Sequence, residues 1–340
     1  MQSQVLFQYG FILISSTVLA VVATGCLLWI QYFRGRHTRN LCGDLSRDLI
    51  TRLPQPLPRW TVFEFLLMFG IMIIVATLMQ SPRDVDAVSD ESATVAETEP
   101  ETKIDVAQDV RGSETLDQPA SADVADQVAS DPEADAKKLG SQIKVHFAAN
   151  VTAFLLTLIF IRLVHGASLM HLTLLPTLSD LRRGVFATAW ILPPVLIINV
   201  FVSTLVEYKH PVTDLLAAES GTRTFFMLLV STALVTPVVE EFQFRLLLQG
   251  GLQRLVDRPM PGETGTLWHP TSVWPIYVSS MIFALMHSGQ GAAPIPLFFL
   301  AVGLGFLYQR TGRLFPAIVV HMLLNGTTLC MEFCRVNAGM

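Results

Sequence analysis

Acidic and basic side chains interrupt an apolar stretch that is long enough to cross a membrane. Glu240, Glu241 and Arg245 lie within residues 224–248, which otherwise have the composition of a membrane-spanning helix. A charge at the bilayer centre costs at least about 2.5–3.5 kcal/mol on insertion scales, so two adjacent glutamates need a partner, a proton or a function. At helical spacing Glu241 can pair with Arg245, whereas Glu240 is rotated about 100° away and has no local partner. We interpret Glu240 as a functional residue and the other two as its support.

A proline stands three residues before the glutamates. Pro237 has no N–H to donate to the carbonyl of Ala233, so the preceding helical turn is expected to be loosened. An unpaired carboxylate beside a weakened turn strengthens the prediction of a functional site at this depth.

Two later apolar segments carry polar groups of complementary chemistry. His287 ends the sequence Phe283-Ala-Leu-Met-His287, and His321 and Asn325 are four residues apart and share a helix face. A buried glutamate can act as general base, a histidine can share its proton and hold water, and a histidine–asparagine pair can donate to an oxyanion. No serine or cysteine has an obvious nucleophile setting, so the residues predict glutamate-activated water adding to an amide. We expect Phe283 to pack around this site.

Other functions compete with this hypothesis. Glu240, His287 and His321 have the types that bind zinc, although an HExxH motif is absent, and we expect neither a metal nor another cofactor. A non-catalytic binding or immunity protein could keep the same residues, and a proton-coupled transporter could use Glu240 as its carrier. Strong chelators would separate the zinc enzyme from the metal-free one, and a peptide-cleavage assay would separate either from a scaffold.

The composition indicates the elements that must hold these residues. The chain has 340 residues, of which 51% are hydrophobic and 15% charged, and its mean hydropathy is +0.49. These values predict an all-α, polytopic helical membrane protein, whose partners are the lipid bilayer and a peptide or protein substrate, with no nucleic acid. About eight transmembrane helices are expected, over residues 5–33, 60–80, 144–165, 184–206, 224–248, 273–287, 295–308 and 314–333. The sixth and seventh are short for a full crossing.

Arginine clusters orient these spans. Under the predicted alternation the clusters at 34–59, 182–183, 254–258 and 310–313 all lie on one side, which the positive-inside rule makes cytoplasmic. We expect a multi-pass protein of the plasma or inner membrane. Trp60 is expected to anchor the second span at the interface, with Glu64 reaching back to the same surface.

An acidic segment divides the chain. Residues 81–140 hold 16 acidic and 5 basic side chains and no aromatic ones, so they cannot bury enough apolar surface to offset their chain entropy. We predict two N-terminal helices with a basic cytoplasmic loop (1–80), a disordered acidic linker (81–140) and a catalytic core (141–340).

The chain resembles the CAAX prenyl protease and bacteriocin-processing (CPBP) family, also called Rce1-like or Abi. Glu-Glu-x-x-x-Arg (240–245), Phe-x-x-x-His (283–287) and His-x-x-x-Asn (321–325) occur in the family's order and approximate spacing. The resemblance covers about residues 180–330 and implies an intramembrane endopeptidase in which Glu240 and His287 activate water. It also implies that His321 and Asn325 stabilise the oxyanion, supported by Glu241 and Arg245. Leu246 departs from the family, which often has glycine there.

Overall fold

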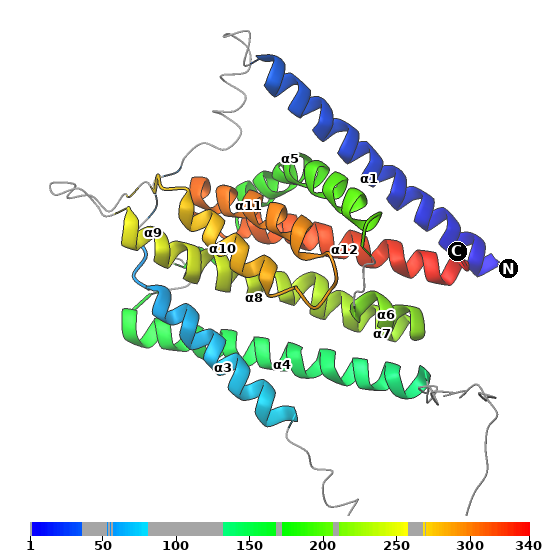
Figure 1. Ribbon diagram of the computed structural model, residues 1–340, viewed down its shortest axis with the longest axis horizontal. Coiled ribbons are helices and arrows are strands. Elements are labelled where there is room, and N and C mark those ends of the chain that lie inside the picture. Colours follow the sequence, from blue (N-terminus) through cyan, green and yellow to red (C-terminus); the bar gives the residue numbers. More distant parts are fainter. Residues whose placement is uncertain are drawn as a thin grey trace, which may run out of the picture.

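The protein is described by a computed structural model that covers residues 2–35, 53, 55, 57–80, 132–167, 172–206, 211–257, 268 and 270–340. These residues are almost entirely helical (Figure 1). In chain order the elements are α1 (Gln2–Gly35), α3 (Val62–Gln80), α4 (Pro132–His165), α5 (Leu178–Ser203), α6 (Pro211–Ala218), α7 (Thr222–Leu228), η1 (Leu229–Val235), α8 (Thr236–Glu241), η2 (Phe242–Gln249), α9 (Gly250–Val256), α10 (Trp274–Leu285), α11 (Pro294–Thr311) and α12 (Phe315–Ala338). The predicted class, a polytopic helical membrane protein, is confirmed.

Each predicted span is helical, but the helices differ in length. Six helices of the described chain are long and apolar enough to cross a membrane, and the longest, Thr222–Val256, is 35 residues. Helix α10 has 12 residues, which is about 18 Å against the roughly 30 Å of a bilayer core. The expected shortness of the sixth span is therefore confirmed, and the turn that carries His287 follows a helix too short to cross.

The glutamate-bearing helix runs through the middle of the bundle. Segments α7, η1, α8, η2 and α9 are continuous, and α12, α10 and α3 pack against them. Helices α3 and α4 form a pair on one side, and α1 lies along α5 and α12 on the other (Figure 1). Residues far apart in the sequence therefore meet around α8 and η2.

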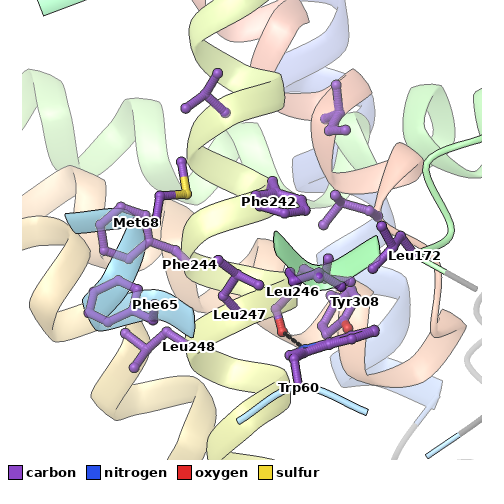
Figure 2. Close-up of a cluster of buried hydrophobic side chains, with 14 of the residues drawn as sticks. Trp60, Phe65, Met68, Leu172, Phe242, Phe244, Leu246, Leu247, Leu248 and Tyr308 are labelled. Atoms are coloured by element: carbon purple, nitrogen blue, oxygen red, sulfur yellow. Dashed lines mark hydrogen bonds between the residues drawn. The ribbon is translucent and has the colours of Figure 1, made fainter. Parts of the chain in front are cut away.

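Apolar side chains of several helices pack around η2. Phe65, Phe242, Leu246 and Leu247 belong to one buried cluster, shown in Figure 2. Trp60 also lies in it, only 4% exposed, and its indole N–H donates to the Leu246 carbonyl at 2.7 Å. The predicted interfacial role of Trp60 is therefore wrong, because the indole finds its hydrogen-bond partner inside the protein.

One end of the bundle gathers the arginines. Arg254 donates to the carbonyl of Arg59 at 2.6 Å, and Arg313 binds Asp180 at 2.6 Å. The amide of Leu53 donates to the carbonyl of Arg310 at 2.9 Å. These contacts place the arginine-bearing segments together, as predicted, and fix the start of α12 against α5. The assignment of this end to the cytoplasm stays a prediction.

The predicted disordered linker is too long at its C-terminal end. Helix α4 begins at Pro132, so residues 132–140 are helical rather than disordered. Alanines and lysines in this stretch favour helix, and Ala136 is buried beside Leu215 of α6. Residues 81–131, and the greater part of the basic loop after α1, lie outside the described residues.

Candidate active site

The backbone beside the glutamates departs from regular α-helix. Two π-helical segments, η1 and η2, flank the six residues of α8 that end in Glu240 and Glu241. In this register Thr236 donates to Ser231, five residues back, and the same step from Pro237 leads to Thr232. A π-helical step back from Pro237 therefore reaches the Thr232 carbonyl, whereas the prediction named Ala233 on α-helical spacing.

Asn325 fills this gap. Its side-chain Nδ2 donates to the Thr232 carbonyl at 3.0 Å. The bond ties α12 to the weakened turn and uses one of the two amide hydrogens of Asn325, which leaves one for another acceptor.

Glu241 and Arg245 form the ion pair that their spacing predicts. Arg245 Nε donates to Glu241 Oε2 at 3.0 Å, and both side chains are fully buried. Arg245 Nη1 also donates to Ser279 Oγ on α10 at 3.3 Å, and Ser279 in turn donates to the carbonyl of Phe244. Two buried charges are tolerated together because they are paired and hydrogen-bonded. Ser279 was not predicted, since a serine in an apolar helix has no distinctive spacing.

His321 lies between the two glutamates. Its Nδ1 lies 3.0 Å from Glu241 Oε1, and its Nε2 lies 3.6 Å from Glu240 Oε2. Because a carboxylate only accepts, Nδ1 carries the proton that Glu241 binds. Glu241 therefore fixes the orientation of the ring, and this orientation directs Nε2 at Glu240.

Glu240 has fewer protein contacts than its neighbour. Its side chain is 22% exposed, whereas that of Glu241 is fully buried between arginine and histidine. The predicted rotation of about 100° between the two residues thus leaves Glu241 bound to its partners and Glu240 partly exposed.

His287 follows α10 in a turn and stacks on Phe283. The two ring centroids are 4.8 Å apart, and Phe283 lies 6.2 Å from the ring of His321. His287 Nδ1 donates to the Phe283 carbonyl at 2.8 Å, which leaves Nε2 with a free lone pair. Phe283 also lies under the Arg245 guanidinium at 5.5 Å, so it contacts all three polar groups. The phenyl ring therefore spaces the two imidazoles, as expected for a residue packing around the site.

The metal-binding alternative needs three donors directed at one point. Within the described part of the chain, no group of three His, Cys, Asp or Glu side chains is arranged to hold a metal ion. Glu241 is already bound by Arg245 and by His321 Nδ1. The residues present do not form a preassembled zinc site.

Comparison with known proteins finds one family for the central part of the chain. Residues 222–327 match the family described as type II CAAX prenyl endopeptidase Rce1-like. This segment contains Glu240, His287, His321 and Asn325, so the part of the chain that carries these residues is similar to that family. No curated protein matches the chain. No solved structure matches it either.

Leu246, the departure from the family pattern, is buried among apolar side chains. Its side chain is 1% exposed and belongs to the apolar cluster that contains Trp60.

Proposed function

We propose that this protein is an intramembrane endopeptidase that hydrolyses a peptide bond with water activated by Glu240. The observation that carries the proposal is that the two adjacent carboxylates have different partners. Both oxygens of Glu241 bind protein groups, on Arg245 and on His321. Glu240 is partly exposed, and its carboxylate faces Nε2 of His321. A partly exposed carboxylate inside a membrane bundle has the position required of a general base.

The reaction follows from the free atoms of the site. Glu240 takes a proton from a water molecule, while the lone pair of His287 Nε2 accepts a hydrogen bond from the same water. The oxygen attacks the scissile carbonyl, and the negative charge moves to the carbonyl oxygen. The remaining amide hydrogen of Asn325, and Nε2–H of His321 in its protonated form, donate to that oxyanion. Glu240 then passes its proton to the leaving nitrogen, and the C–N bond breaks.

The substrate is a peptide or protein segment that reaches the membrane, such as a C-terminal tail. A plasma or inner membrane location agrees with the arginine distribution. All groups used in the reaction come from the chain itself, so we expect cleavage to continue in strong chelators, whereas zinc-dependent chemistry would stop.

The test uses purified protein in detergent or vesicles and a peptide library. We expect Glu240→Ala and His287→Ala each to abolish cleavage while the melting temperature stays close to that of the wild type. Neither side chain makes an ion pair as short as the one between Glu241 and Arg245. Equal cleavage by wild type and both variants would overturn the assignment and favour a binding protein.

A further inference from the structure

A row of polar residues continues from the site along one side of its helix. Glu241, Arg245, Gln249, Gln253 and Asp257 recur every four residues through η2 and α9. Residues at this spacing share a helix face. The row ends at Asp257, whose carboxylate accepts hydrogen bonds from Thr271 and Ser272 at the arginine-rich end of the bundle. It therefore runs from the carboxylate next to Glu240 to the arginine-rich end of the bundle.

The middle of the row is buried and incompletely hydrogen-bonded. Gln249 and Gln253 are both 0% exposed. Gln253 has no hydrogen-bond partner for either amide atom among the described residues, and Gln249 Oε1 and Arg245 Nη2 are also unpaired there. Buried polar atoms of native proteins are almost always paired with protein or with ordered water, because an unpaired one destabilises the fold. Four such atoms on one row point to a shared partner.

A glycine lets the neighbouring helix α11 come close to this row. Gln249 Nε2 donates to the carbonyl of Gly305 on α11, and a Cβ placed on Gly305 would lie 2.9 Å from Gln249 Oε1 and 2.7 Å from Ile276. Any larger residue at 305 would press on the unpaired oxygen. The glycine thus leaves the backbone of α11 beside the Gln249 amide with no side chain between them.

We propose that Arg245, Gln249 and Gln253 bind a file of internal water molecules that connects the site with the surface at Asp257. Water suits the row because it donates and accepts, whereas an ion of either sign would be matched by only part of each amide. The role of the file in catalysis rests on the proposed function, since each hydrolysis consumes one water inside the bilayer.

The first test detects the water itself and does not need activity. X-ray radiolysis in H₂¹⁸O labels buried side chains next to bound water. We expect label on Ile276, which lies with Gln249 Oε1 around Gly305, and none on Leu247, which is equally buried in the apolar cluster. The inactive Glu240→Ala protein should give the same pattern, so the result stands whether or not the protein is a peptidase. An unlabelled Ile276 in the wild type would overturn the proposal.

The second test compares two similar glutamines. Gln243 is 3% exposed and also has an unpaired Nε2, but it lies off the row, so Gln243→Met is the matched control for Gln253→Met. We expect Gln253→Met to lower kcat about tenfold, the factor that losing one ordinary hydrogen bond from a transition state produces, with KM and melting temperature preserved. Gln243→Met should leave kcat unchanged. Equal kcat values for the two variants would overturn the supply role.

Discussion

Two glutamate–histidine pairs in this protein have similar contacts and different surroundings. At the start of α3, Glu64 Oε1 lies 2.6 Å from His165 Nε2, and its other oxygen accepts from the Thr61 amide at 2.7 Å and from the Thr61 hydroxyl at 2.9 Å. In the bundle centre, Glu241 holds His321 Nδ1 at 3.0 Å and Arg245 Nε at 3.0 Å. Each of these carboxylates is fully occupied by partners.

The difference lies in what the histidine does with its second nitrogen. His321 directs Nε2 at the accessible carboxylate of Glu240, 3.6 Å away, whereas the outer pair has no second carboxylate in contact with His165 among the described residues. Glu64 instead accepts from the Thr61 amide, and the Thr61 hydroxyl accepts from the Phe63 amide, which is a structural arrangement at the start of a helix. A glutamate–histidine contact therefore indicates chemistry here only where a further, accessible group is attached to it.

The largest difference in kcat is expected between variants that neutralise Glu240 and Glu64. Glu240→Gln should lower kcat by about 10²–10⁴-fold, the range typical of a lost general base, because the amide cannot take a proton from water. The measurement is the cleavage rate at saturating peptide, with Glu64→Gln as the matched control. If Glu64→Gln cleaved peptide as slowly as Glu240→Gln, the claim that only the central pair takes part in cleavage would be contradicted.

Breaking the buried ion pair should reduce stability most. Arg245→Met leaves the buried Glu241 carboxylate without its cationic partner and with only His321 beside it, and breaking a buried ion pair typically costs about 3–5 kcal/mol of unfolding free energy. The double variant Arg245→Met/Glu241→Gln should recover much of that loss, because no uncompensated charge remains. Thermal unfolding in detergent measures both. A single variant as stable as the wild type would show that Arg245 does not hold the site.

A smaller effect is expected where α12 meets the weakened turn. Asn325→Leu removes the bond to the Thr232 carbonyl and leaves this carbonyl unpaired, at about 1–3 kcal/mol of stability. Cleavage should slow as well, since an oxyanion donor is lost. Asn337→Leu, which removes the amide contact to the Ser220 carbonyl nearer the end of α12, is the control for stability alone. Equal cleavage rates for the two variants would remove Asn325 from the reaction.

The outer pair should give the smallest change. Glu64→Gln keeps an acceptor for Thr61 but weakens the contact with His165, so we expect a loss of about 0.5–1.5 kcal/mol in stability. Its kcat should match that of the wild type. The unfolding free energy and the cleavage rate, taken on one preparation, check both statements.

The sequence predicts local features of this protein better than contacts between distant segments. The Glu241–Arg245 pair follows from their spacing on one helix, and the divergence of Glu240 follows from helical rotation. The contact between Glu241 and His321 joins residues 80 apart in the sequence, so their spacing cannot show it, and the family resemblance supplied only the set of residues. The π-helical register places Thr232 five residues before Pro237 as its missing acceptor, where α-helical spacing predicts Ala233, and no single residue type indicates this register. Trp60 has the amphipathic character of an interfacial residue, and only the packed structure shows that its partner is Leu246.

The central claim is that Glu240 activates water without a covalent intermediate. The most direct test is single-turnover cleavage of a membrane-inserted peptide in H₂¹⁸O, with a strong chelator present, by wild type and by Glu240→Gln. The account predicts ¹⁸O in the new carboxylate of the wild-type product, no peptide attached to the protein, and product formation by Glu240→Gln that is at least about 10²-fold slower. A trapped peptide–protein adduct, or product formed by Glu240→Gln at the wild-type rate, would contradict it.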